Sequence, residues 1–351
     1  MIPSLDIILV NRNSGHELAQ CLSSIVQADT TALVLRRVCV VDDASTDNSA
    51  AGLDKIALPL ELIRNLTHTG YGASCNRAAG GATADYILFL NTDSTLFADS
   101  LDKPIRYLEA PEHSGVGMVG IQLLDAEGII SRSCSVFPTP GLMISNALGF
   151  DRLFPRLFPS RQMKRWDHLE TREVDQVIGA FLLLRNAVFE RLGGYDERFF
   201  VYGEDLDLSL RMRQLGYRSV YLASAQAVHQ GGGTFRKVRG ESLFFALRSR
   251  IQYAFKHFGF LRGSIVAVVT LCLEPITRCL WAVSRQEVDE LKATIEAYLR
   301  LWAELFCGRL SREIRRGQPH SAVRCHRKAN PDHSRLREGA AGEMADPEGG
   351  S

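Results

Sequence analysis

Three acids, Glu204, Asp205 and Asp207, lie close together in the segment GGYDERFFVYGEDLDLSLR. The apolar residues that follow Asp205 cannot all share one face of a helix, so we expect this stretch to be buried. Buried carboxylates without partners are costly, and apolar surroundings raise their pKa. A carboxylate with a raised pKa suits a general base. Acids that complement a helix dipole would explain Glu204 or Asp207, but they explain the whole cluster poorly.

Polar residues also follow four short apolar segments that read as strands buried on both faces of a parallel sheet. In such sheets, ligands bind at the carboxyl ends of the strands. Four polar ends at one edge of a sheet indicate a site better than any one of them alone. The strand candidates are Ile7–Val10, Val38–Val41, Leu60–Ile63 and Tyr86–Leu90, followed by Asn11, Asp42-Asp43, Arg64-Asn65 and Asn91-Thr92-Asp93.

The residue types at these ends suggest separate roles. Asp93 suits a hard divalent cation that takes its remaining ligands from a diphosphate and water. One of Asp42 and Asp43 could accept the N3–H of a pyrimidine, and the other could cap the following turn. The glycines of Gly70–Asn76, ahead of a helix, would let phosphate approach closely. His229 precedes a glycine run and is a candidate metal or phosphate ligand, although a lone histidine is more often structural.

The elements that must position these residues alternate between strand and helix. Helical segments are expected at Glu17–Gln27, Ser45–Ile56 and Gly70–Ala82, which gives a doubly wound α/β unit. Further strands are expected at Val116–Leu124 and Gly179–Leu184, with a short apolar run at 219–223. Between them, the Phe-, Pro- and Arg-rich stretch Val136–Arg165 predicts a long loop near a substrate.

The pattern becomes helical from Glu241 onward. Phe260–Val283 is strongly apolar but is interrupted by Glu274, Pro275 and Arg278, and its uninterrupted part is too short to span a bilayer. We therefore expect an interfacial or re-entrant helix around residues 264–283; the alternative is a helix packed on the catalytic domain. Beyond Arg316 the composition predicts disorder.

Composition narrows the class of protein. The formal net charge is +1, which does not suggest a nucleic-acid partner. Residues 236–351 carry 20 Lys and Arg against 13 Asp and Glu, and a basic region of this kind fits an anionic membrane surface. The eight cysteines form no CxxC pair, so we expect a reducing compartment and no zinc site. No signal peptide is expected at the N-terminus.

Taken in order, several segments resemble the family 2 inverting glycosyltransferases of the GT-A fold, especially the rhamnosyltransferase-like branch. They are ILVNRNSG, VVDDASTDNS, RNLTHTGYGASCNRA, YILFLNTDS, VIGAFLLLRN, GGYDERFFVYGEDLDLSLR and AVHQGGGT. The resemblance implies a Rossmann-like, mostly parallel sheet flanked by helices, with a C-terminal helical extension. We expect a catalytic domain over residues 1–235, a membrane-associating helical region over 236–316 and a disordered tail over 317–351.

The resemblance also implies roles for single residues. Asp205 would be the catalytic base, and Asp93 and His229 would hold a Mg²⁺ or Mn²⁺ ion on the donor diphosphate. Gly179, Ala180 and Glu204 would lie at the acceptor. The donor would be bound by Asn11, Asp42, Arg64, Gly72, Asn76 and Asn91.

These roles predict an inverting, metal-dependent transfer of rhamnose or another hexose. The donor would be a dTDP- or UDP-linked sugar, and the acceptor a cell-surface glycan or a lipid-linked glycan. We expect the chain in the cytoplasm, peripheral on the inner face of the cell membrane. The alternatives are a nucleotidyltransferase that acts on sugar phosphates and a non-catalytic nucleotide-sugar-binding protein.

Overall fold

A computed structural model describes residues 2–231, 239–308, 310 and 314 of the chain. The predictions for the glycine run after Gly231 and for the tail 317–351 lie outside the described residues. The predicted domain boundaries, at residues 235 and 316, stay predictions.

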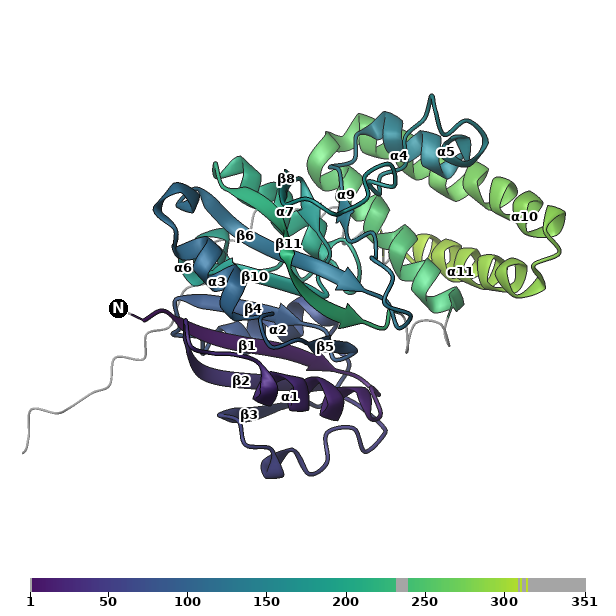
Figure 1. Ribbon diagram of the computed structural model, residues 1–351. Coiled ribbons are helices and arrows are strands. Elements are labelled where there is room, and N and C mark those ends of the chain that lie inside the picture. The colour runs from purple at the N-terminus through teal and green to yellow at the C-terminus, as the bar shows by residue number, and fades with distance from the viewer. Residues whose placement is uncertain (1, 232–238, 309, 311–313, 315–351) are drawn as a thin grey trace, which may run out of the picture. The chain divides into compact units, whose positions relative to one another are not determined.

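A mixed sheet of nine described strands forms the centre of the fold (Figure 1). Its first four strands run parallel in the order β3-β2-β1-β4. The sheet continues through the antiparallel strand β10 to β6, β11 and β5, and β8 pairs with β11. The mostly parallel sheet expected from the sequence is confirmed. The strands are β1 (Ser4–Asn11), β2 (Val34–Asp43), β3 (Leu60–Asn65), β4 (Tyr86–Leu90), β5 (Ser94–Leu96), β6 (Val116–Leu124), β8 (Arg172–Val174), β10 (Phe181–Arg185) and β11 (Arg218–His229).

Both faces of the sheet are covered by helices, which explains why its strands are continuously apolar. Alternate residues of β1 belong to different cores, with Ile7 in one and Ile8 in the other. Burying one such side chain contributes about 1.5–3 kcal/mol. The core around Ile7 includes α1 (Glu17–Gln27) and α3 (Asp102–Glu109), and the core around Ile8 includes α2 (Tyr71–Ala79), α6 (Asn186–Leu192) and α7 (Glu204–Gln214).

The helix expected at Ser45–Ile56 is wrong, because the only helical element in this segment is the short 3-10 turn η1 (Leu53–Lys55). A second 3-10 turn, η2 (Pro111–His113), follows α3. Side chains compete for the backbone within Ser45–Ile56. The side-chain oxygen of Asn13 accepts from the Thr46 N–H at 2.7 Å, and the Asp47 carboxylate accepts from the Gly15 N–H at 3.0 Å. Such bonds favour turns over a helical ladder.

The long loop expected at Val136–Arg165 is partly wrong, because it contains α4 (Pro140–Ala147) and α5 (Phe150–Leu153). Thr139 caps α4 by accepting a hydrogen bond from the Leu142 N–H at 3.2 Å, and Pro140 occupies the first helical position. The segment is bordered by two short antiparallel strands that pair with each other, β7 (Cys134–Ser135) and β9 (Gln176–Val177).

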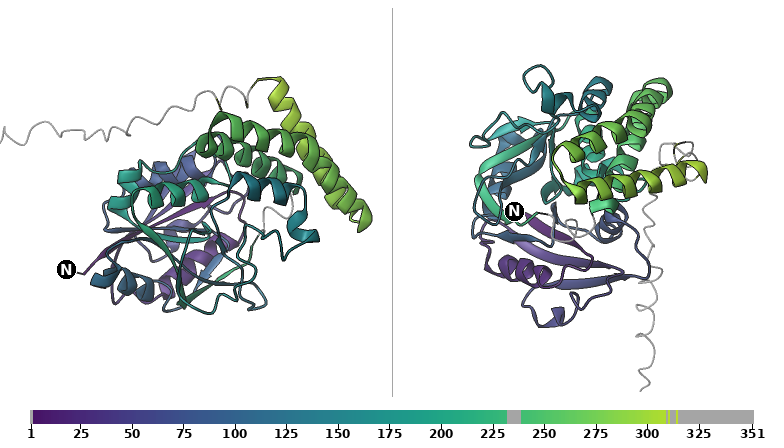
Figure 2. Two further views of the ribbon diagram at one scale, coloured as in Figure 1. Left: turned by 90° about the horizontal axis from the view of Figure 1, so that it is seen from above. Right: turned by 90° about the vertical axis from the view of Figure 1, so that its right-hand side faces the viewer.

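The C-terminal region is helical, as expected. Its elements are α9 (Arg239–Val268), the π-helical turn η3 (Val269–Leu273), α10 (Glu274–Ser284) and α11 (Val288–Phe306). Figure 2 shows α11 beside α9 and α10. A kink at Gly259, where φ is 75°, divides α9. Among the described residues, one continuous helical stretch, Arg239–Ser284, has the length and hydropathy to cross a membrane.

The first half of α9 packs against the N-terminus of α7 and the residues before it. Tyr253 and Ala254 share a small core with Phe199, which precedes the acidic cluster, and with Leu206, which lies within it. The Ser249 hydroxyl donates to the Val201 carbonyl at 3.0 Å. The N-terminus of α7 is therefore supported by α9, which lies about fifty residues away in the sequence.

Candidate active site

Three of the predicted donor-binding residues lie in one row across the ends of β1, β2 and β3. The strand registers pair Asn11 with Asp42 and Asp42 with Arg64. The buried Asn11 amide donates to the Asp42 carboxylate at 3.1 Å and to the Ser49 hydroxyl at 2.9 Å. The Asp42 carboxylate is thus held at the strand end beside the exposed Arg64.

Asp43, the neighbour of Asp42, is buried and holds a loop. Its carboxylate accepts from the Asn65 amide at 2.9 Å and from the backbone N–H groups of Thr69 and Gly70, and it contacts His68 Nδ1 at 2.6 Å. Burial alone would raise the pKa of Asp43, but the hydrogen bonds from His68, Asn65 and Thr69 lower it well below its usual range. These bonds leave Asp42 as the acid available to a ligand.

Asn91, Asp93 and His229 come together at the ends of β4 and β11. The antiparallel pairing of β11 with β5 puts His229 opposite Ser94, and the Gln230 N–H donates to the Asp93 carbonyl at 3.1 Å. Asp93 Oδ1 lies 3.2 Å from His229 Nε2, and the Asn91 amide nitrogen lies 3.4 Å from that same Nε2. All three side chains are partly accessible.

The Asp93–His229 pair fits a divalent cation of the kind expected. Two neighbouring ligands of an octahedral ion at about 2.1 Å lie about 3 Å apart, which is close to the observed 3.2 Å. The described residues contain no group of three or more His, Cys, Asp or Glu side chains placed to hold a metal ion. Two protein ligands leave the remaining positions to phosphate and water, the usual arrangement for a cation that arrives with a diphosphate.

Asp205 lies in the first turn of α7, where the chain makes a tight bend. Tyr202 and Gly203 both have positive φ, 67° and 83°, so the chain turns sharply just before α7. The Asp205 carboxylate accepts from the Leu206 N–H at 2.7 Å and from the Gly179 N–H at 3.2 Å. Burial raises the pKa of Asp205, opposed by the charge of Arg161 and by these hydrogen bonds.

The two flanking acids have different surroundings. Glu204 is buried, and its Oε2 has no hydrogen-bond partner among the described residues; burial, with the charge of Asp205, raises its pKa to about 8. Asp207 is fully buried but pairs with Arg211 at 2.7 Å, with His257 at 2.8 Å and with Lys256. Burial would raise the pKa of Asp207, but hydrogen bonding to His257 and the charges of Arg211 and Lys256 lower it.

The dipeptide Gly179–Ala180 joins the two parts of the site. The Gly179 N–H binds Asp205, and the Ala180 carbonyl accepts from the Asn91 N–H at 3.0 Å. The Tyr71 hydroxyl lies 3.5 Å from the Gly179 carbonyl. Gly179 therefore holds Asp205, and the next residue, Ala180, holds the chain at Asn91, two residues before Asp93.

Gly72 and Asn76 are the predicted donor-binding residues that the structure does not bring to these groups. The Asn76 amide donates to the Tyr195 carbonyl at 2.9 Å, and its oxygen accepts from the Tyr195 N–H at 2.8 Å. A Cβ on Gly72 would lie 3.3 Å from Tyr195 Cβ. Both residues pack α2 against the segment before α7, and their donor roles stay predictions without support from these contacts.

Two polar residues near Asp205 were missed. The Arg161 guanidinium donates to the Gln176 side chain at 3.0 Å, and Gln176 in turn hydrogen-bonds to Asp205. Burial lowers the pKa of Arg161, and the Asp205 carboxylate opposes this effect. The arginine-rich run around Arg161 was visible in the sequence, but nothing local in it indicates a contact forty residues further on.

The structure is similar to solved glycosyltransferases. A mannosyltransferase from Pyrobaculum calidifontis, solved with GDP-mannose and Mn²⁺, aligns with a TM-score of 0.51 and 17% identity over 86% of this chain and 88% of its own. GalNAc-T7, solved with UDP, GalNAc and Mn²⁺, aligns with a TM-score of 0.50 and 14% identity over 72% of this chain and 47% of its own. At these identities the likeness shows the fold alone, and the expected GT-A fold is confirmed.

Residues 6–192 match the model of glycosyl transferase family 2, and the chain belongs to that family. It is a glycosyltransferase, as the sequence predicted. Two relatives have more specific names. An N-acetylglucosaminyl-diphospho-decaprenol L-rhamnosyltransferase of Mycobacterium tuberculosis is 28% identical over 65% of this chain and 76% of the relative. Rhamnosyltransferase WbbL of Escherichia coli K12 is 27% identical over 70% of this chain and 86% of the relative.

The raised pKa of Glu204 makes a prediction about stability. Between its unfolded pKa, about 4.3, and about 8 in the fold, the folded chain holds a proton that the unfolded chain releases. Stability is therefore lost as pH rises through this window. Glutamine is neutral at every pH, so Glu204→Gln should not lose this stability. The melting temperature of Glu204→Gln minus that of the wild type should therefore be several degrees larger at pH 8.5 than at pH 5.

The matched control is Glu190→Gln, which removes an exposed carboxylate from the neighbouring helix α6. Its melting temperature should follow that of the wild type at both pH values. If the difference in melting temperature between Glu204→Gln and the wild type is the same at pH 5 and at pH 8.5, Glu204 is not protonated in the fold and the assignment is wrong.

Proposed function

We propose that this glycosyltransferase moves a hexose, with inversion, from a nucleoside-diphosphate sugar to a lipid-linked glycan, with Asp205 as base and a divalent cation at Asp93 and His229. One observation carries the proposal: Gly179 binds the Asp205 carboxylate, and the next residue binds the strand end that bears Asp93. A proton acceptor and a diphosphate site on adjacent residues are what a direct displacement at a sugar C1 needs.

Asp205 is the better base of the two neighbouring acids. With a pKa of about 8, Glu204 is protonated near neutral pH and can donate a hydrogen bond to the acceptor but cannot take its proton. Asp205 accepts two backbone N–H groups and lies near Arg161, which favours its ionised form. The two carboxyl groups thus take different roles because their surroundings differ.

The reaction is a single displacement. The acceptor oxygen forms a bond to C1 of the sugar as the bond from C1 to the diphosphate oxygen breaks, and the acceptor proton passes to an Asp205 oxygen. The nucleoside diphosphate leaves with the bonding electrons. A Mg²⁺ or Mn²⁺ ion held by Asp93 and His229 would supply positive charge to the leaving diphosphate. One attack from the opposite face inverts the anomeric carbon without a covalent enzyme intermediate.

The row of Asn11, Asp42 and Arg64 supports binding of the donor nucleotide. The partly accessible Asp42 carboxylate can accept the N3–H of a uracil or thymine, which favours a UDP- or dTDP-linked donor. Rhamnose is the proposed sugar, because both named relatives are rhamnosyltransferases. The lipid-linked acceptor follows the name of the mycobacterial relative, and it implies a cytoplasmic chain bound peripherally to the inner face of the membrane.

Replacing the base should separate binding from chemistry. Asp205→Asn keeps the size of the side chain but cannot take the acceptor proton, so kcat should fall by about 10²–10⁴. The Kd of the donor nucleotide, measured by calorimetry, should change less than about twofold. Glu190→Gln on α6 is the control and should keep both values. Transfer at the wild-type rate by Asp205→Asn would refute the base assignment.

A second experiment tests the cation. UDP or dTDP should bind the wild-type chain at least about tenfold more tightly with Mn²⁺ than without it, a factor typical of losing a metal contact. In Asp93→Ala this difference should vanish. Asp99→Ala, which removes a partly exposed acid that pairs with Lys103, serves as the control. Equal nucleotide affinities of the wild type with and without Mn²⁺ would exclude this role for Asp93.

A further inference from the structure

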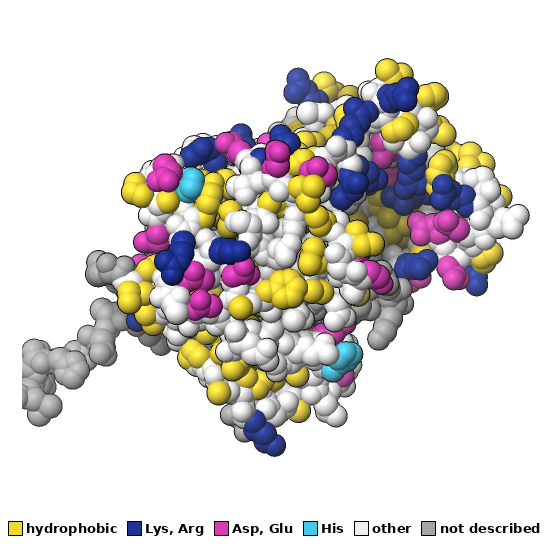
Figure 3. All heavy atoms as spheres, in the orientation of Figure 1, with side chains coloured by type: hydrophobic (Ala, Val, Ile, Leu, Met, Phe, Trp, Pro, Cys, Tyr) yellow, Lys and Arg dark blue, Asp and Glu magenta, His cyan; other side chains and the backbone are white. Residues whose placement is uncertain are grey.

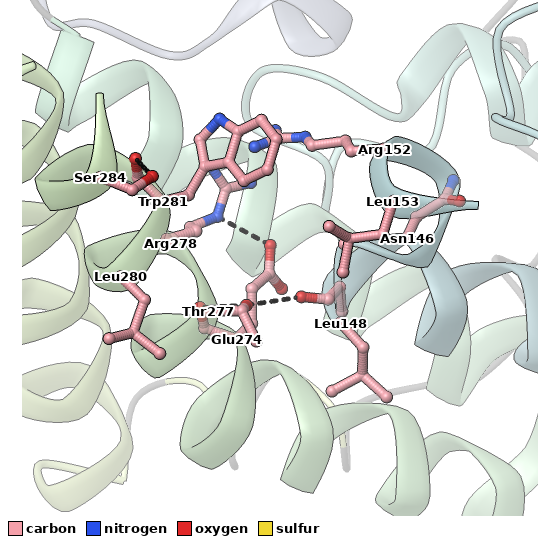
Figure 4. A pocket seen from close by; sticks show the side chains of 12 residues that line it. Asn146, Leu148, Arg152, Leu153, Glu274, Thr277, Arg278, Leu280, Trp281 and Ser284 are labelled. Atoms are coloured by element: carbon pink, nitrogen blue, oxygen red, sulfur yellow. Dashed lines mark hydrogen bonds and ion pairs between the residues drawn. The ribbon is translucent and has the colours of Figure 1, made fainter. Parts of the chain in front are cut away.

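A cavity of about 330 Å³ lies outside the site described above, between α4, α5 and α10. Figure 4 shows Arg152 and Arg278 beside the Trp281 ring, with Leu153, Leu148 and Leu280 around them. The Thr277 hydroxyl donates to the Ala147 carbonyl at 2.9 Å and so fixes α10 to α4. The cavity is therefore bounded by two elements that are hydrogen-bonded to each other.

The charges around this cavity favour an anion. Its one acid, Glu274, is almost fully buried and is neutralised by Arg278 at 2.9 Å and by Arg250. Arg152 adds a further positive charge 5.4 Å from the Trp281 ring. Residues 150–165, the segment that includes the cavity residues Arg152 and Leu153, carry five Lys and Arg and one Asp. Arginine pairs bind phosphate groups well because each guanidinium offers several donors in one plane.

The same cavity opens onto an exposed apolar stripe on one face of the helices around it. Successive residues of the stripe are three or four positions apart, a spacing that puts side chains on one face of a helix. The one spacing of five positions, from Val268 to Leu273, coincides with the wider π-helical turn η3. The stripe is about 35 Å long at 1.5 Å per residue. Its residues, all exposed, are Leu261, Ile265, Val268, Leu273, Ile276, Leu280 and Val283.

Leu280 belongs both to the stripe and to the wall of the cavity. Figure 3 shows basic and apolar side chains over α4, α5 and α10. Contiguous apolar surface of this kind marks an interaction site rather than a solvent face. Apolar surface that continues from an arginine-lined cavity matches a molecule with an anionic head and a long apolar tail.

Charged residues also connect the cavity with the catalytic base. Glu274 binds Arg250, and Arg250 and Asp205 both lie close enough to Arg161 to influence its pKa. Arg161, Arg250 and Arg278 thus form a basic row between Asp205 and the cavity. A row of this kind can bind the phosphates of one molecule whose sugar end reaches Asp205.

We propose that the cavity binds the phosphate-linked end of a polyisoprenyl-diphosphate acceptor. Its diphosphate contacts Arg152 and Arg278, and its first isoprene units lie on Trp281 and Leu280. The rest of the tail follows the stripe into the bilayer surface. This assignment rests on the proposed function, since it places the lipid-linked acceptor of that reaction.

Calorimetry of the full chain with three probes tests the site. Farnesyl diphosphate has both head and tail, and inorganic diphosphate and farnesol each have one. Farnesyl diphosphate should bind at least tenfold more tightly than either of the others. Arg152→Glu should weaken the binding of farnesyl diphosphate tenfold or more, whereas Arg156→Glu, an equal charge change at an exposed residue just after α5 and outside the cavity wall, should not.

The tail has its own pair of variants. Leu280→Asp should weaken the binding of farnesyl diphosphate, whereas Leu299→Asp, at an exposed leucine of α11 outside both the cavity wall and the stripe, should leave its affinity within twofold of wild type. Inorganic diphosphate that binds as tightly as farnesyl diphosphate would reduce the site to one for free anions and overturn the proposal. Equal effects of Arg152→Glu and Arg156→Glu would overturn it as well.

The proposed function can fail separately from this site. Transfer of sugar from the donor is measured in parallel, with any acceptor that the chain accepts. Binding of farnesyl diphosphate that depends on Arg152 in a chain that transfers no sugar would leave the site standing and refute the reaction. Transfer to a lipid-linked acceptor that is unchanged by Arg152→Glu would refute the site and leave the reaction standing.

Discussion

Three acids at one buried helix start cannot all carry the same charge, and the rest of the site depends on how that constraint is met. Burying an ionised carboxylate costs several kcal/mol of solvation free energy unless the carboxylate is paired. Asp207 is ionised because Arg211, Lys256 and His257 surround it. Glu204 has no cationic partner among the described residues, and its raised pKa keeps it neutral near pH 7. Asp205, with two backbone donors and Arg161 nearby, is left as the acid that can exchange a proton.

The same constraint explains why helix α9 contacts the acidic cluster. Lys256 on α9 contacts both Asp207 and Asp196, so it links α7 to the segment before it. His257, the next residue, completes the pairing of Asp207. Without these cations Asp207 would compete with Asp205 and Glu204 for protons. Helix α9 therefore sets charge states in the site while its far half carries the exposed apolar stripe.

Much of the architecture follows from local patterns in the sequence. The strand at Tyr86–Leu90 and the helix at Glu17–Gln27 have the expected bounds, because a continuous apolar run and a clear 3.6-residue period leave few alternatives. The helix expected after Asp43 was wrong, since Asn13, far earlier in the chain, binds its backbone. Helix α4 was missed although Thr139 and Pro140 form a recognisable start.

The site was predictable where polar residues end neighbouring strands and unpredictable where partners come from distant segments. The positions of Asp42 and Asp93 at one edge of the sheet could be predicted, because parallel strands bring their carboxyl ends together. The roles of Arg161 and Lys256 could not be found, because each depends on a contact between segments that no local period relates. Gly72 and Asn76 were expected to bind the donor because of their glycine-rich pattern, but in the structure both residues pack α2 against Tyr195.

The central claim is that one carboxylate, Asp205, serves a single displacement at the sugar. The anomeric configuration of the glycoside product, determined by NMR and compared with that of the nucleotide-sugar donor, tests this claim most directly. The account predicts a product of opposite configuration. A product that retains the configuration of the donor would require a second displacement and a nucleophile, and would contradict it.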